Sequence, residues 1–270
     1  MMVDAHQLVF LKLGGSLITD KASAHTARLD ILGRLAREIN AALAARRDLR
    51  LVIGHGSGSF GHVPAKKYGT RGGVRTPAGW HGFAEVWREA RTLNQLVIEA
   101  LASAGLPVIA MPPSAGVTAM GGEIVRWDLE PLRAALSAGL IPVINGDTIF
   151  DQLHGGTILS TEELFLHLAR QLHPRRILLA GIEEGVWGDY PVCQQLIAEI
   201  NPANFDRIAP LLGSSMATDV TGGMRSKVET MLALVRNLPE LEVLIFSGLQ
   251  PDVLKNALAG GSPGTKIVRG

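Results

Sequence analysis

Two kinds of apolar pattern alternate along this chain. Short unbroken apolar runs, of which Leu8–Leu13 is the first, predict strands that are buried on both faces. Apolar residues at three- and four-residue spacing, as from Ile31 to Leu43 after the potential cap Asp30, predict helices between them. Further strands are expected at Leu49–Ile53, Pro107–Met111, Ile141–Asn145, Arg176–Leu179, Leu241–Phe246 and Lys266–Val268. Further helices are expected at Gly79–Ala104, Leu129–Ala138, Thr161–Leu172, Gly223–Leu238 and Pro251–Ala259, and hairpins at Val117–Arg126 and Phe150–Ile158.

This alternation predicts an α/β fold in which a mostly parallel central sheet is sandwiched by helices. His173 and Pro174 break the helix that ends near Leu172. We therefore expect one continuous domain with two lobes, residues 1–172 and residues 173–270. Ligands of such folds bind beyond the carboxyl ends of the strands.

Composition and charge narrow the class of protein. With 270 residues, 47% of them hydrophobic, the chain can bury a large core. A formal net charge of +1 gives no protein-wide basic field, so neither a nucleic acid nor a membrane is an expected partner. The uncharged stretch Leu101–Gly122 contains Pro107, Pro112 and Pro113, which favours a strand between turns over a spanning helix. A single cysteine, Cys193, and an N-terminus without a signal-peptide pattern predict a cytoplasmic location.

Three glycine-rich turns carry the strongest chemical signal. They are Lys12–Ser16 after the first strand, Gly56–His62 after the second, and Asp219–Lys227 at the start of a late helix. Glycine lets the backbone approach an anion closely, and the N–H groups at a helix start point toward that anion. Gly146-Asp147 also follows a strand. We therefore expect this pair and the first two turns to share one crevice that holds phosphates.

Other interpretations of these turns are weaker. Gly56–Gly61 matches the G-x-G-x-x-G fingerprint of dinucleotide-binding proteins. That fingerprint needs an acidic residue about 20 positions later at the end of a strand, whereas Thr76–Trp80 leads into a helix. This disfavours a nicotinamide enzyme, and the P-loop pattern is absent. No histidine pair, cysteine cluster or carboxylate triplet has metal-ligand spacing, so no metal held by the protein alone is expected.

Basic side chains near the turns are candidates for phosphate contact. Lys12 lies in a buried strand without a carboxylate nearby in sequence, which favours an anionic ligand, although it could also reach water from the strand end. Lys227 lies beside the apolar stripe of its helix, where it faces a cleft or only covers apolar surface. His62 closes the second turn, whereas His55 at its start suits a structural role. Lys21, taken alone, is a solvated loop charge.

Together these segments resemble the amino acid kinase superfamily, and most closely the isopentenyl phosphate kinases. The run from Lys12 to Lys21 is similar to that family's first motif, and His55–His62 is similar to its H-G-G-G-x-F-G-H loop. Gly146-Asp147 and Asp219–Lys227 resemble its two later motifs. The histidine that closes the loop is shared by fosfomycin kinases and is absent from acetylglutamate, aspartate and uridylate kinases.

The resemblance implies phosphoryl transfer from ATP to isopentenyl phosphate, with Mg²⁺ bound through the ATP phosphates, by a homodimer with β-hairpins near the acceptor. It implies that Lys12, Lys21 and His62 are catalytic, and that Gly56, His62 and Gly146 lie beside the acceptor. The implied ATP-binding residues are Lys12, Gly14, Gly15, Ser16, Ser57, Gly181, Gly222 and Lys227. An apolar pocket for the acceptor tail is expected at Phe83, Val86 and Trp87, which could equally be core residues.

The implied reaction needs no general base. A phosphomonoester has a second pKa of about 6, so at neutral pH its dianion can attack the γ-phosphate directly. Catalysis then depends on positioning and on neutralising charge.

Three segments depart from the family pattern. Ser57 replaces a glycine of the loop, Ser160-Thr161-Glu162 replaces an S-G-D segment, and Ala180–Gly185 replaces a T-D-x-D-G stretch that contacts nucleotide. The acceptor half therefore matches better than the nucleotide half. Two alternatives stay open: a fosfomycin kinase, and a nucleotide-binding protein that has lost phosphoryl transfer.

Overall fold

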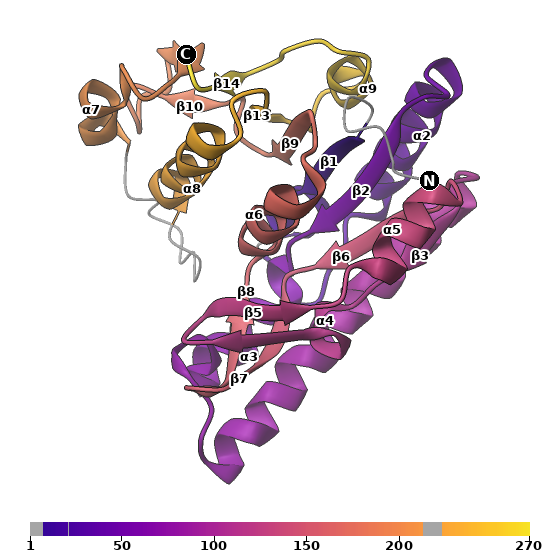
Figure 1. The fold of residues 1–270 in the computed structure, drawn as a ribbon, viewed down its shortest axis with the longest axis vertical. Helices are drawn as coiled ribbons and strands as arrows, with labels where there is room; N and C mark the ends of the chain where they lie inside the picture. Colours follow the sequence, from indigo (N-terminus) through magenta and orange to yellow (C-terminus); the bar gives the residue numbers. More distant parts are fainter. Residues whose placement is uncertain (1–7, 21, 213–222) are drawn as a thin grey trace.

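The computed structural model describes residues 8–20, 22–212 and 223–270. At its centre is a sheet with the strand order β12-β14-β13-β9-β1-β2-β6-β3 (Figure 1). These strands are β1 (Leu8–Leu13), β2 (Arg50–His55), β3 (Val108–Ala110), β6 (Ile141–Asn145), β9 (Arg176–Gly181), β12 (Glu199–Ile200), β13 (Glu242–Ser247) and β14 (Thr265–Ile267). Neighbouring strands run parallel except β13 and β14, which confirms the expected mostly parallel sheet.

Helices cover both faces of the sheet because the strand side chains alternate between two hydrophobic clusters. In β1, Leu8 and Phe10 belong to one cluster, while Val9, Leu11 and Leu13 belong to the other. The first cluster includes residues of α5 (Glu130–Ser137), α6 (Thr161–Leu172) and α8 (Gly223–Asn237). The second includes residues of α1 (Gly15–Ile18), α2 (Leu29–Ala45), α3 (Gly58–Tyr68), α4 (Pro77–Ser103) and α9 (Val253–Leu258). The result is a sheet between two helical layers.

A second sheet has the strand order β5-β4-β7-β8 and lies beside α3 and the lower part of α4 in Figure 1. Its strands are β4 (Val117–Met120), β5 (Glu123–Trp127), β7 (Asp147–Asp151) and β8 (Gly155–Leu159). The pairs β4–β5 and β7–β8 are antiparallel, so both expected hairpins are confirmed. The other elements described are the small sheet of β10 (Val186–Trp187) and β11 (Leu196–Ile197), the helix α7 (Phe205–Ile208), and short 3-10 helices at Thr70–Gly72, Pro113–Ala115 and Ala209–Leu211.

The structure corrects some expected helix boundaries. Helix α2 begins at Leu29 after Arg28, so Asp30 lies in its first turn and does not cap it. Helix α4 begins at Pro77, and the preceding Thr76 side chain accepts a hydrogen bond from the Gly79 N–H. Helix α3 was not expected at all, because Pro64 and neighbouring lysines interrupt its apolar pattern.

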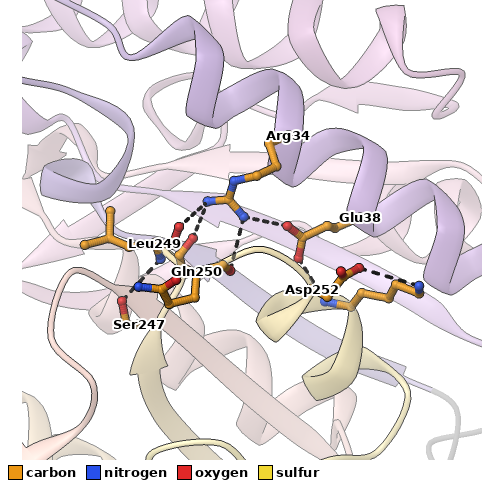
Figure 2. A network of polar contacts seen from close by, with 8 residues as sticks. Arg34, Glu38, Ser247, Leu249, Gln250 and Asp252 are labelled. Carbon is orange, nitrogen blue, oxygen red and sulfur yellow. Dashed lines mark hydrogen bonds and ion pairs between the residues drawn. The ribbon is translucent and has the colours of Figure 1, made fainter.

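A polar network ties the end of β13 to α2 (Figure 2). The guanidinium of Arg34 donates hydrogen bonds to three successive carbonyls, those of Gly248 at 2.6 Å, Leu249 at 3.1 Å and Gln250 at 3.3 Å. It also pairs with the carboxylate of Glu38, which is 7% exposed. Since Gly248 N–H in turn bonds Gly181 O, this network fixes the chain beside the end of β9.

We expect Arg34→Ala to lower the free energy of unfolding by about 2–3 kcal/mol, because charge-assisted hydrogen bonds are lost and the buried Glu38 carboxylate loses the Arg34 charge, keeping a hydrogen bond from the Lys255 N–H. Urea denaturation of the variant measures the change. The matched control is Arg37→Ala, one turn away on the exposed side of α2, which should change stability by less than about 0.5 kcal/mol. Equal losses in the two variants would contradict a role for the Arg34 network.

Candidate active site

A cavity of about 900 Å³ lies at the carboxyl ends of β1, β2, β6 and β9. The segments expected to share one crevice all line it: Gly14-Gly15, residues of Gly56–Gly61, and Gly146-Asp147. The first residues of α1, α3, α6 and α8 line it as well. A helix start presents free N–H groups and the positive end of the helix dipole, so four such starts make the cavity suited to bound anions.

The turns after β1 and β2 touch each other. A Cβ atom on Gly15 would lie 2.5 Å from the Gly58 nitrogen, so only glycine fits there without a shift of the backbone. Gly58 itself has a φ of +52°, which glycine adopts freely. The buried hydroxyl of Thr19 joins the two turns, because it donates to Gly15 O at 2.7 Å and accepts from Ser59 N–H at 3.0 Å.

Ser57, which replaces a glycine of the family loop, has ordinary backbone angles of φ −74° and ψ −17°. The backbone at this position therefore does not require glycine. The Ser57 hydroxyl donates to Gly146 O at 3.3 Å and thereby links the turn after β2 to the turn after β6. The serine is thus accommodated with the loop in place.

Lys12 has a partner that local sequence did not indicate. Its Nζ lies 2.7 Å from Oε1 of Glu162 in the first turn of α6, and both side chains are largely buried. Burial alone would raise the pKa of Glu162, but the charge of Lys12, the charge of Lys227 and the hydrogen bond from Lys12 outweigh it and hold the pKa below its ordinary value. The three groups leave a net positive charge in the wall of the cavity.

Glu162 is therefore a site residue that the sequence analysis missed. Its position had been noted only as part of the segment that departs from S-G-D. The capping box at Ser160 and Glu163 starts α6 and holds the backbone on both sides of Glu162. The spacing of Ser160 and Glu163 could have indicated from the sequence that a helix starts here, and the structure places this helix start at the cavity.

The two histidines of the second turn have different surroundings. His55 is fully buried, with Nε2 3.0 Å from Asn94 Oδ1 and Nδ1 3.2 Å from Gly56 O. Burial lowers the pKa of His55, with the nearby Lys12 charge acting in the same direction. A neutral imidazole enclosed in this way holds α4 against the end of β2. His62 lies in α3 and lines the cavity.

Asp147 is a buried carboxyl group in the cavity wall. Burial raises the pKa of Asp147 to about 6, against the hydrogen bonds that the carboxylate accepts from the N–H groups of Ser114 and Thr148. Its negative charge is therefore present mainly above pH 6, where it makes this part of the wall less favourable to an anion.

Other predicted site residues fall in different places. Ser16, Gly181 and Lys227 line the cavity, whereas Lys21 and Gly222 lie outside the described residues. Of the expected tail pocket, only Val86 lines the cavity.

The other two residues of that pocket, Phe83 and Trp87, lie elsewhere. Phe83 packs against Trp80 and Phe150, and Trp87 is 38% exposed with the Arg91 guanidinium over its ring. Trp87 follows Val86 directly and so points about 100° away from it around the helix. Ala65 and Ile158 supply apolar lining that was not anticipated.

Nothing in the described part of the chain gathers three or more histidine, cysteine, aspartate or glutamate residues in a way that could hold a metal ion. Glu162 is engaged by Lys12. Mg²⁺ keeps few protein ligands when substrate phosphates coordinate it, so Mg²⁺ bound to ATP would fit this cavity. Of the helices described, none is both long and apolar enough to cross a membrane.

Comparison with known proteins agrees with this geometry. The model of the amino acid kinase family matches residues 7–247. The isopentenyl phosphate kinase of Methanocaldococcus jannaschii is 32% identical over 96% of this chain and 98% of its own length. The isopentenyl phosphate kinase of Haloferax volcanii is 35% identical over 97% of this chain and 99% of its own length. A crystal structure of isopentenyl phosphate kinase superposes with a TM-score of 0.79 at 29% identity, covering 97% of this chain and 100% of that one. The chain therefore belongs to the amino acid kinase family, in the group formed by the isopentenyl phosphate kinases.

Proposed function

We propose that this protein transfers the γ-phosphoryl group of ATP to isopentenyl phosphate and releases isopentenyl diphosphate and ADP. The observation that carries the proposal is the meeting of Lys12, His62 and Lys227 in one cavity with two glycine-rich turns. The near full-length similarity to isopentenyl phosphate kinases supports the choice of acceptor.

The proposed roles follow the two sides of the cavity. Lys12, Lys227 and the N–H groups of the turn Gly14–Ser16 bind the ATP phosphates, together with Ser57, Gly181 and the undescribed Gly222. Gly56, His62 and Gly146 hold the acceptor phosphate. Lys21, also outside the described residues, stabilises the transferring group. We propose that residues 1–172 form the acceptor lobe and residues 173–270 the nucleotide lobe.

The reaction is a displacement between two phosphates. An oxygen of the acceptor phosphate forms a bond to the γ-phosphorus, while the bond from that phosphorus to the β–γ bridging oxygen breaks and its electron pair leaves with ADP. The acceptor is already a dianion at neutral pH, so no side chain has to remove a proton. Lys12 and Lys227 offset the charge that spreads over the transferring oxygens. Mg²⁺ bound to the ATP phosphates would neutralise further charge.

The apolar part of the acceptor needs an uncharged wall. Val86 of α4, Ala65 of α3 and Ile158 of β8 line the cavity, and Ala65 lies on the same helix as His62. A short hydrocarbon tail buried there contributes about 0.8 kcal/mol for each CH₂ group. We therefore propose that this wall selects a small apolar alkyl phosphate.

We also propose that the protein acts in the cytoplasm as a homodimer. Its free Cys193 suits a reducing compartment. Large exposed apolar side chains on the second sheet, among them Met120, Val125 and Phe150, would be covered by a second copy.

A panel of acceptors tests the proposed function. With Mg-ATP, we expect ADP release with isopentenyl phosphate to be far faster than with acetylglutamate, aspartate, carbamate or UMP, because only the first pairs a phosphate with a short apolar tail. Fosfomycin belongs in the same panel, since His62 and the lysines could also hold a phosphonate. Faster turnover of fosfomycin would replace the proposed acceptor. ATP binding without ADP release on every acceptor would show a nucleotide-binding protein without transfer.

A further inference from the structure

The segment between α1 and α2 forms part of the rim of the cavity. Its base is closed by hydrogen bonds from Asp20 N–H to Thr26 O at 2.9 Å and from Arg28 N–H to Ile18 O at 2.8 Å. Residues 22–26 are exposed, and Ala22 and Ala24 line the cavity. This rim segment, residues 22–26, therefore projects from a fixed base and borders the space where substrates would bind.

The side chain of His25 fastens the rim segment to two neighbouring helices. His25 Nδ1 lies 2.6 Å from Oε2 of Glu89 on α4, and its ring meets the Phe60 ring of α3 edge to face at 5.7 Å. The hydrogen bonds of the Asp20 and Thr26 side chains, by contrast, join residues within 20–26 to one another. His25 also has a φ of +52°, a left-handed conformation that a non-glycine residue keeps only when its surroundings hold it.

Both contacts of His25 lie on the acceptor side of the cavity. Phe60 stands between the lining residues Ser59 and Gly61, and Glu89 is one helical turn from the lining residue Val86. The pair His25–Glu89 therefore connects the rim to the two helices that carry His62 and the apolar wall.

We propose that His25 and Glu89 are a positioning pair that keeps the rim segment closed over the cavity during phosphoryl transfer. The expected effect on kcat rests on the proposed function, whereas the contact that holds the rim segment does not. A closed rim keeps water away from the γ-phosphoryl group and holds the acceptor side in place.

The exposure of the two side chains to solvent limits how much the loss of the His25–Glu89 pair can lower kcat. The His25 side chain is 50% exposed and that of Glu89 is 19% exposed, so solvent screens the pair. Losing it should lower the closed population, and with it kcat, by about three- to fivefold. A loss of several orders of magnitude is not expected from such a pair.

The test uses His25→Asn, Glu89→Gln and the double variant of the full chain. Asparagine tolerates the left-handed backbone, so His25→Asn removes the ring without adding strain. Each single change should lower kcat about threefold or more, leave the KM for ATP unchanged, and raise the ratio of ATP hydrolysed by water to acceptor phosphorylated. The double variant should be no worse than either single one, because both changes remove the same contact.

Two further measurements make the test decisive. Hydrogen exchange of the amides of residues 22–27 should become faster in all three variants while Tm stays unchanged. Glu99→Gln, the same chemical change ten residues further along α4, is the control and should alter neither exchange nor kcat. Additive kinetic losses, unchanged exchange, or no rise in ATP hydrolysis would overturn the proposal. An inactive wild-type protein would instead refute the proposed function, and the exchange experiment would still decide on the pair.

Discussion

Replacing Lys12 by methionine should lower kcat/KM by at least about a thousandfold, the range found when a charge that stabilises a transferring phosphoryl group is removed. Methionine keeps much of the apolar stem, so the change removes mainly the charge. In the structure Lys12 is held at the end of β1 by Glu162 at 2.7 Å, on the wall of the cavity. Steady-state kinetics with isopentenyl phosphate and Mg-ATP measures the loss.

The same variant also disturbs stability, and a second substitution separates the two effects. Without Lys12, Glu162 loses both the charge and the hydrogen bond of that lysine, so its pKa rises. In the wild-type protein the pKa of Glu162 is lower in the folded state than in the unfolded state. The ionised carboxylate therefore stabilises the fold at pH values above the ordinary carboxyl pKa. This stabilisation is lost as the pH falls through the pKa of Glu162 in the folded protein. Lys12→Met together with Glu162→Gln should therefore recover stability at neutral pH but not activity. Recovery of activity would show that Lys12 acts only through folding.

His62→Ala should cost about 2–4 kcal/mol of transition-state stabilisation, or about 30- to 1000-fold in kcat/KM for the acceptor. The variant lacks the imidazole N–H that α3 holds in position to donate a hydrogen bond to the acceptor phosphate. His62→Gln retains an N–H donor and should recover part of the loss. ATP affinity, measured by calorimetry, should hardly change, because the lysines and the turn after β1 are untouched.

His81→Ala is the control for this experiment, since His81 lies exposed on α4 and is absent from the cavity lining. It should leave the kinetics with isopentenyl phosphate near those of the wild type. If His62→Ala behaves like His81→Ala, the histidine of α3 has no part in binding the acceptor.

Seven of the eight strands in the central sheet could be predicted because each carries its own signal, whereas the two-residue strand β12 was not expected. Unbroken apolar runs such as Leu8–Leu13 are what burial on both faces requires, and the structure assigns alternate side chains of β1 to opposite clusters. The place of the cavity followed from the same reasoning, because the glycine-rich turns come at the ends of parallel strands. Helix α6 was found with its ends in place, since Ser160 caps its start and His173 ends it in a left-handed conformation.

What the sequence could not show depends on contacts between distant residues. The partner of Lys12 lies 150 positions away and meets it only because β1 and the start of α6 converge. Helix α3 escaped notice because Pro64 hides its period, although tertiary packing of Phe60 supports it. Trp87 was expected in the tail pocket because it lies on the helix after the second glycine-rich turn, but the turn of α4 leaves it partly exposed to solvent.

The hydroxyl of Thr19 has a consequence for how the two substrates bind. It is bonded at once to the turn after β1, which we propose binds the nucleotide, and to the turn after β2, which we propose faces the acceptor. We therefore expect a movement of either turn to be transmitted to the other, so that occupation of one half of the cavity alters the entropy that the other half still has to lose on binding. Thermodynamic reciprocity then requires that whatever factor ATP applies to the affinity for the acceptor, the acceptor applies to the affinity for ATP.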